Sequence, residues 1–196
     1  MKKLLLVIAM VAAGFTANAQ EGSKGGFEKQ DWYVTGTAGY SDSSEGDSDA
    51  SVFTFSPSVG YFVSENIALE AGLIIGSGSQ TSVGNEVDYN SFGVNLGGNY
   101  FFTPKNDFSF IVGAGLSYVS SGREVNGVDQ PDSDTFAIVV APGVNYFISE
   151  NFALRASIGA LSYSNTSIDV NGAPSTDNFR LNLNLSDINF GLTYKF

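Results

Sequence analysis

The chain has 196 residues, of which 43% are hydrophobic, and it contains 23 glycines, 16 phenylalanines and 9 tyrosines. Its 20 acidic and 9 basic residues give a formal charge of −11, which repels nucleic acid, so we expect no nucleic-acid partner. No cysteine is present, which excludes disulfides and thiolate metal sites. No histidine is present either, which removes the side chain that most often acts as a catalytic base near neutral pH.

The beginning of the chain has the pattern of a secretory signal peptide. A positively charged start, "MKK", precedes an apolar run at 4–13, and the small residues "ANA" follow at 17–19. The run is too short to span a membrane as a helix, and no later stretch reaches about 18 consecutive apolar residues. We therefore predict a signal peptide at 1–19 with cleavage after Ala19, an N-terminal periplasmic segment at 20–31 and one folded domain at 32–196.

From residue 32 onward, apolar residues alternate with glycine, serine, threonine and asparagine. In the segment 53–63, the odd positions carry Phe, Phe, Pro, Val, Tyr and Val, while the even positions are mostly Ser, Thr and Gly. Alternation with a period of two predicts strands that have two chemically different faces. We expect eight strands, near 32–41, 51–63, 67–77, 88–102, 108–120, 134–148, 152–164 and 186–196.

The expected connections between these strands alternate in length. Three are short and lie at 64–66, 103–107 and 149–151. Four are long and polar and lie near 42–50, 78–87, 121–133 and 165–185. Outer-membrane barrels have short periplasmic turns and longer extracellular loops, so this pattern predicts that both chain ends lie in the periplasm.

Three features favour a transmembrane barrel over a soluble sandwich of two sheets. The expected strands have about 10–15 residues, which is long for a soluble sheet and enough to cross a bilayer at a tilt. One face is small and polar, which suits a barrel interior, and only a closed barrel pairs every backbone group of its strands within hydrocarbon. Large aromatic residues near the ends of the apolar face suit an interfacial girdle. Its expected members are Trp32, Tyr61, Tyr100 and Tyr146, together with Tyr40, Tyr118 and Tyr194. We therefore predict an all-β fold, an eight-stranded antiparallel up-and-down transmembrane β-barrel.

One eleven-residue stretch occurs twice, as "GYFVSENIALE" at 60–70 and as "NYFISENFALR" at 145–155. The spacing corresponds to four strands, or half of the expected barrel, so duplication of a half-barrel and convergence on one turn design are both open. Both "SEN" segments are expected to be equivalent periplasmic turns. A looser third version, "NYFFTPKND", occupies 99–107.

The repeat ends on Glu70 in the first copy and on Arg155 in the second. The neighbours Leu69 and Ala71, like Leu154 and Ala156, share the lipid-facing parity, so both charges should point into the lumen. A charge on the lipid face would cost about 2–4 kcal/mol near the membrane midplane, which supports the inward placement. We expect Glu70 and Arg155 to belong to one polar network that fills the lumen with Tyr, Asn, Ser and Thr neighbours.

The chain ends in "INFGLTYKF", in which Phe196, Tyr194 and Leu192 alternate with polar or small residues. Upstream, Leu181, Leu183 and Leu185 lie on the other parity, and a bulge near 186–187 would reconcile the two. With its amphipathic strands, "YF(V/I)SEN" turns and terminal "YKF", the whole chain after the signal peptide resembles the small eight-stranded outer-membrane β-barrels of Gram-negative bacteria. These are the OmpX-like and OmpA-transmembrane-domain-like proteins, often described as an outer membrane protein beta-barrel domain or as the porin family.

This resemblance implies an integral protein of the Gram-negative outer membrane, surrounded by membrane lipids and lipopolysaccharide. It also implies that Tyr194 and Phe196 form a C-terminal signal for the barrel-assembly machinery. Small barrel enzymes of this membrane use a histidine in or near the catalytic group, and this chain has none, so we predict no enzymatic activity and no catalytic residue. No spacing of residues predicts a cofactor site or a metal site.

Two functions remain after an enzyme is set aside. The preferred one is a structural or cell-surface interaction role, with a lumen filled by side chains and a partner, not identified, that binds the acidic connections. The alternative is a narrow channel for ions or small solutes, because inward glycines such as Gly93, Gly97 and Gly113 leave room in a barrel that eight strands otherwise fill.

The expected lumen network makes a prediction for stability. Arg155→Leu should lower the melting temperature of the folded barrel, because it leaves the Glu70 carboxylate unpaired in the interior. A melting temperature equal to that of the wild type would remove the network from the interpretation.

Overall fold

The structure, a computed structural model, describes residues 25–46, 48–158, 160–182 and 188–196. Within these ranges, no helix has the length and the apolar character needed to cross a membrane. The predicted signal peptide at 1–19 and its cleavage after Ala19 lie outside the described residues. Of the predicted N-terminal segment 20–31, the structure describes residues 25–31.

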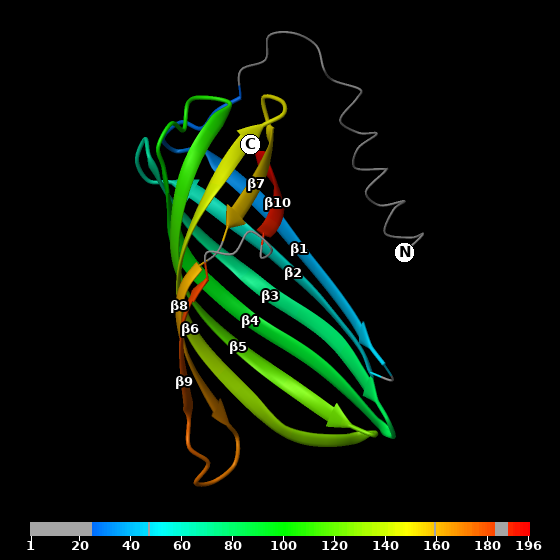
Figure 1. Ribbon diagram of the computed structural model, residues 1–196. Helices are drawn as coiled ribbons and strands as arrows, with labels where there is room; N and C mark the ends of the chain where they lie inside the picture. Colours follow the sequence, from blue (N-terminus) through cyan, green and yellow to red (C-terminus); the bar gives the residue numbers. More distant parts are fainter. Residues whose placement is uncertain (1–24, 47, 159, 183–187) are drawn as a thin grey trace.

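The described chain forms ten strand segments, labelled in Figure 1. They are β1 (Trp32–Glu45), β2 (Ser48–Phe62), β3 (Ile67–Ser82), β4 (Asn85–Phe101), β5 (Phe108–Val125), β6 (Val128–Phe147), β7 (Phe152–Ile158), β8 (Ala160–Ile168), β9 (Thr176–Asn182) and β10 (Ile188–Lys195). β6 pairs with both β7 and β8, and these two pair with β10 and β9 respectively. The last four segments are therefore two interrupted strands, and the molecule is the all-β, eight-stranded antiparallel barrel that the sequence predicts.

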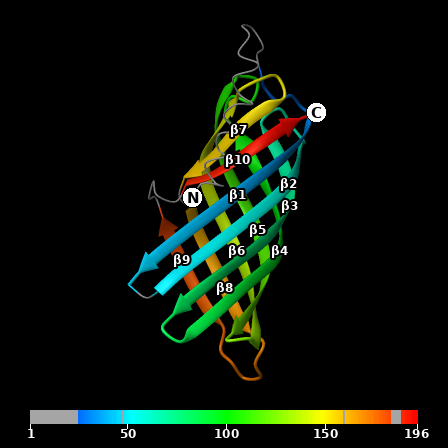
Figure 2. The same ribbon diagram turned by 90° about the vertical axis from the view of Figure 1, so that its right-hand side faces the viewer.

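Neighbouring strands of the barrel are neighbours in the sequence, as in an up-and-down barrel. The circle closes where β1 pairs with β10, from Tyr33 opposite Lys195 to Thr37 opposite Gly191. The turns at 63–66, 102–107 and 148–151, the described start at Gly25 and the C-terminus lie at one end, called here the turn end. The opposite end carries the connections after β1, β3, β5 and β8 and is called the hairpin end (Figures 1 and 2).

The outward side chains form an apolar belt with a sharp limit towards the hairpin end. On β3, for example, the belt consists of Ile67, Leu69, Ala71, Leu73 and Ile75. About nine residues make roughly 30 Å of strand, which at a tilt of about 40° spans roughly 23 Å, close to the height of about 25 Å of outer-membrane barrels. On every strand the next outward residue is polar. These residues are Asp42, Ser51, Ser77, Asn90, Ser120, Asp134, Asn165 and Asp177.

The prediction of four long polar connections is wrong, because most of their residues belong to strands. β3 ends at Ser82 and β4 begins at Asn85, and β5 ends at Val125 and β6 begins at Val128. β1 and β2 are likewise separated only by 46–47, and the segment 169–175 is the one longer connection at this end. Beyond the belt both faces of a strand meet water, so the hydrophobic alternation stops while the backbone ladder continues. The asymmetry between the two ends therefore lies in strand length and not in loop length.

Left-handed residues make these tight turns possible. Asn126 and Gly127 have φ values of 51° and 77°, as a two-residue hairpin turn of type I′ requires, and Gly84 has a φ of 77°. The Asn-Gly pair is the strongest short-range hairpin signal, and the expectation of a loop at 121–133 overlooked it.

A register shift accompanies the change of parity near the end of the chain. On β6, Gly143 pairs with Ser157 of β7 and Val140 with Leu161 of β8, so three steps face four. One extra residue turns the following side chains to the opposite face. The exposed Leu181 of β9 and Phe190 of β10 accordingly lie on different parities. The predicted position of a bulge at 186–187 lies outside the described residues.

The hairpin turn after β5 gives a prediction for stability. Gly127→Ala should lower the free energy of unfolding by about 1 kcal/mol, because a Cβ is disfavoured at a positive φ. Gly39→Ala is the matched control, since a Cβ there meets nothing within 4 Å and no left-handed φ is involved. Urea unfolding followed by the fluorescence of the single tryptophan, Trp32, measures both variants. Equal effects of the two substitutions would contradict the role of the turn.

Candidate functional site

The two "SEN" turns have the same geometry. In the first, the Ser64 hydroxyl accepts a hydrogen bond from the backbone N–H of Ile67 at 3.0 Å, and the Asn66 amide donates to the backbone oxygen of Phe101 at 2.7 Å. The second turn repeats both bonds, from the N–H of Phe152 to Ser149 at 3.1 Å and from Asn151 to the oxygen of Lys195 at 2.8 Å. The serine therefore closes each turn, and the asparagine ties it to the end of a neighbouring strand.

Each strand that runs towards the turn end finishes on a tyrosine followed by one inward residue. β2, β4 and β6 end in Tyr-Phe, and β10 ends in Tyr194-Lys195. Consecutive residues of a strand take opposite faces, so each tyrosine lies on the outer surface and the residue after it points into the lumen. The three inward phenylalanines, Phe62, Phe101 and Phe147, are buried.

These phenylalanines surround Phe27, which comes from the segment before β1. The Phe27 side chain is fully buried, and its ring centroid lies 4.7 Å from that of Phe62, 4.9 Å from Phe147 and 5.4 Å from Phe101. The Tyr33 ring is 5.2 Å away. Such distances are typical of favourable aromatic pairs. The turn end of the lumen is therefore filled by an aromatic plug, defined here as Phe27, Tyr33, Phe62, Phe101 and Phe147.

On the hairpin side of the plug, and next to it, the structure brings Glu70 and Arg155 together across the barrel. The guanidinium Nη1 of Arg155 lies 2.7 Å from Oε2 of Glu70, and the two side chains are only 11% and 20% exposed. The same oxygen accepts hydrogen bonds from the Tyr33 hydroxyl at 2.9 Å and the Asn99 amide at 3.0 Å. Ser58 donates to Oε1 at 2.8 Å. The carboxylate is thus fully engaged, as a buried charge must be.

The neighbouring backbone is shaped to admit this network. A Cβ on Gly60 would overlap the ring of Tyr33, so glycine at this position lets the tyrosine lie across β2 towards Glu70. Arg155 lies against two aromatic faces, with Cζ 5.0 Å from the ring centroid of Tyr33 and 5.6 Å from that of Phe101. Cations are attracted to aromatic faces at such distances. The ion pair and the plug are therefore joined by shared side chains.

The hairpin side of the ion pair opens into a cavity of about 480 Å³. Glu70 and Arg155 belong to its lining. The cavity wall also carries hydroxyl and amide groups, from Thr35, Thr37, Ser56, Asn95, Ser157 and Asn189. Among the described residues, Asn145 Oδ1 and Arg155 Nε and Nη2 are buried without a protein partner, so water is the expected partner in this layer. The cavity lining also includes aliphatic residues such as Ile74, Ile111 and Val139. The lumen is therefore mixed in character on one side of the pair and aromatic on the other.

Five of the predicted girdle residues, Trp32, Tyr61, Tyr100, Tyr146 and Tyr194, lie on the outer surface at the turn end. The other two, Tyr40 and Tyr118, are exposed near the opposite limit of the belt. The side chains of Trp32, Tyr100 and Tyr146 are exposed, and Tyr61 packs against Trp32 with 4.7 Å between ring centroids. At the C-terminus, Tyr194 contacts Phe152 and Phe196, at 4.9 and 5.2 Å between centroids. This geometry suits an interfacial position of these rings.

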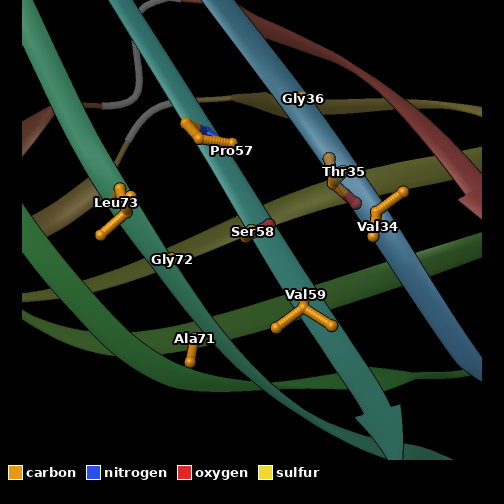
Figure 3. A pocket seen from close by; sticks show the side chains of 9 residues that line it. All are labelled: Val34, Thr35, Gly36, Pro57, Ser58, Val59, Ala71, Gly72 and Leu73. Atoms are coloured by element: carbon orange, nitrogen blue, oxygen red, sulfur yellow. The ribbon is translucent and has the colours of Figure 1, made fainter.

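A shallow depression of about 560 Å³ crosses β1, β2 and β3 on the same outer surface (Figure 3). Its outward positions include the small or compact residues Gly36, Pro57 and Ala71. Pro57 has no N–H, and the β2–β3 ladder passes from Phe55 to Ser58 without a pairing at 56–57. The depression lies inside the apolar belt.

The hairpin end is strongly acidic. Its strand extensions and turns carry Asp42, Glu45, Asp49, Glu86, Asp88, Glu124, Asp129, Asp132, Asp134, Asp169 and Asp177. Only Arg123 and Arg180 provide positive charge among the described residues of this region. No group of three or more acidic side chains among those described is arranged to hold a metal ion.

Comparison with known proteins decides the family. The family model described as "Outer membrane protein beta-barrel domain" matches residues 6–196. This chain belongs to that family of outer-membrane β-barrels. A comparison with curated proteins finds no match.

Several solved outer-membrane barrels have a similar fold. Neisserial surface protein A is 19% identical with a TM-score of 0.53, and the match covers 84% of this chain and 97% of that one. OprG from Pseudomonas aeruginosa is 15% identical with a TM-score of 0.51, over 87% and 98%. Ail from Yersinia pestis, in complex with the heparin analogue sucrose octasulfate, is 13% identical with a TM-score of 0.50, over 86% and 99%. At these identities the likeness concerns the fold alone.

Sequence reasoning placed Glu70 and Arg155 in the lumen, and the structure adds the partners of both. It missed the aromatic plug, although a signal for it was present. The inward parity of Phe62, Phe101 and Phe147 contradicts a purely polar interior, and the three residues occupy the same place in three strand ends. Phe27 gave no signal, because it lies in a short segment without periodicity.

A double-mutant cycle tests the ion pair. Glu70→Leu should destabilise the barrel by about 3 kcal/mol or more, because Arg155 remains buried without its partner. Glu70→Leu combined with Arg155→Leu should cost clearly less than the sum of the two single variants. The exposed pair Lys105–Glu65, at 3.5 Å, is the control, and Lys105→Ala should cost less than about 1 kcal/mol. Additive costs at positions 70 and 155 would show that the pair does not act as one unit.

Proposed function

We propose that this chain is a non-enzymatic outer-membrane barrel that acts at the cell surface and whose lumen is closed in the resting state. The observation that carries the proposal is the obstruction of the lumen by two successive layers. The aromatic plug fills the turn end, and the Glu70–Arg155 pair spans the barrel next to it on the hairpin side. Eight strands leave an interior that side chains can fill, whereas aqueous porins use about sixteen.

The proposed absence of enzymatic chemistry is supported by composition. The chain has neither histidine nor cysteine, so the common general base and the common thiolate nucleophile are missing. The buried ion pair is engaged by structural partners on the acidic side, since Glu70 accepts bonds from Tyr33, Ser58, Asn99 and Arg155. A carboxylate in this state is poorly placed to accept a proton from a substrate.

The proposed site of action is the acidic hairpin end. Its strands extend beyond the apolar belt, and its charge favours a cationic partner, such as a basic protein segment, over a polyanion. The structure of Ail contains a bound polyanion, sucrose octasulfate, and the acidic side chains of this chain disfavour that ligand class. Within the membrane we propose lipids and lipopolysaccharide as the surroundings, with recognition of Tyr194 and Phe196 by the barrel-assembly machinery during biogenesis. We also propose the orientation in which the turn end faces the periplasm.

A narrow channel remains the second candidate. The observation that favours it is the cavity of about 480 Å³ on the hairpin side of the ion pair, which is lined in part by hydroxyl and amide groups. A channel would use this cavity as its vestibule and would need a path past Arg155 and the plug.

Reconstitution in planar bilayers distinguishes the two candidates. The wild-type barrel should show no stable single-channel steps, because the aromatic plug fills the lumen at the turn end. The measurement is made at several voltages and at high salt, with a known porin to show that insertion is detected. Stable steps from the wild type would overturn the closed resting state and favour the channel.

A further inference from the structure

The aromatic plug has an unusual origin, because its central ring does not belong to the barrel wall. Phe62, Phe101 and Phe147 come from the ends of β2, β4 and β6 and approach the axis from three sides. Phe27 lies between them and contacts all three rings. It is carried by residues 25–31, called here the strap, which precede β1. The wall therefore supplies the seat and the strap supplies the ring that fills it.

Few bonds hold the strap in place. The N–H of Phe27 donates to the oxygen of Pro104 at 2.7 Å, and Lys195 Nζ donates to the oxygen of Gly26 at 2.6 Å. The strap also pairs with the end of β2 through Gln30 and Asp31, at 2.9 and 3.0 Å from backbone atoms of Phe62. Local opening of a short segment that is held by few hydrogen bonds and one buried ring needs less free energy than unfolding of the barrel.

Lys195 completes the arrangement at the fourth strand end. The pattern Tyr-Phe, which ends β2, β4 and β6, becomes Tyr-Lys at the end of β10. A fourth inward phenylalanine would present only an apolar face at this place. The lysine instead binds the strap backbone at Gly26 and lies over the ring of Phe147 at 5.7 Å. The strand-end sequence is thus specialised to hold the strap.

The glycines of the strap permit its close approach. A Cβ on Gly26 would lie 2.8 Å from the backbone oxygen of Lys105 and 3.0 Å from its Cα. A Cβ on Gly25 would overlap the side chain of Phe147. A side chain at either position therefore requires a shift, and at Gly26 the obstacle is backbone, which yields less readily than a side chain.

We propose that the strap is a detachable seal: water passes the Glu70–Arg155 layer, where Arg155 Nε and Nη2 have no protein partner, and Phe27 closes the path between this layer and the turn end. This inference goes beyond the closed resting state of the proposed function, because a lumen can also be shut by its wall alone. A load or a partner that acts on the chain ahead of Gly25 would withdraw Phe27 without unfolding a strand. The barrel would then change from a closed to a conducting state.

Two different variants test the seal. Phe27→Ala removes the central ring, and Gly26→Ala displaces the strap by its contact with the Lys105 backbone. Two controls match them in chemistry. Phe102→Ala removes an outward phenylalanine that is 56% exposed, and Gly39→Ala adds a Cβ where nothing lies within 4 Å. Heat-modifiable gel mobility and circular dichroism establish that each variant is folded before its conductance is measured.

In planar bilayers, Phe27→Ala and Gly26→Ala should show stable single-channel steps, whereas the wild type and both controls should show none. If both folded strap variants stay silent, the wall closes the lumen and the seal is overturned, while the closed resting state stands. If the wild type conducts as much as the strap variants, both proposals fail. If Phe27→Ala does not fold, Gly26→Ala decides alone, because its wall residues are intact.

Discussion

The requirement that every backbone group be paired within hydrocarbon governs this structure. Strands that cross a membrane have no water to satisfy a free edge, so the sheet must close on itself. Closure occurs between β1 and β10, where Thr35 and Thr193 face each other in the lumen with their hydroxyl oxygens 2.9 Å apart. Once the sheet is closed, the outward face must be apolar and the inward face must fill a narrow cylinder. The distribution of polar and apolar residues follows from that inversion.

In a narrow barrel, an unfilled space or an unpaired charge in the lumen costs free energy. Opposite walls are near enough that Glu70 on β3 reaches Arg155 on β7, four strands away around the barrel. Buried charges are tolerable only with partners, and here Tyr33, Ser58 and Asn99 supply the remaining hydrogen bonds. Towards the turn end the same space is filled by rings, which need no hydrogen bonds. Tyr33 and Phe101 belong to the plug and also contact the ion pair, so a substitution in one layer should alter the packing of the other.

The repeated stretch now has a physical interpretation. The parts that are identical in the two copies build the turn, since Ser64 and Asn66 make the same bonds as Ser149 and Asn151. The differences in polarity and charge, at 60/145 and 70/155, face the lumen, where the two copies must complement each other. The other two differences exchange one apolar residue for another. Gly60 makes room for Tyr33, whereas the equivalent Asn145 occupies a buried place beside Arg155. Two identical charges at 70 and 155 would repel each other in the same space.

The sequence by itself determined the strand number, the inward and outward faces, the belt and the lumen position of Glu70 and Arg155. Each of these depends on a period of two or on the cost of a charge in lipid, and both are local properties of the chain. Sequence could not give the strand lengths beyond the belt, because water on both faces erases the alternation although Asn126 and Gly127 marked one turn. Only the tertiary structure decided that Phe27 fills the lumen, since its place depends on rings from three distant strand ends and on Lys195. The seven residues 25–31 have no hydrophobic periodicity from which this contact could be predicted. The contact forms only when the barrel has closed around Phe27.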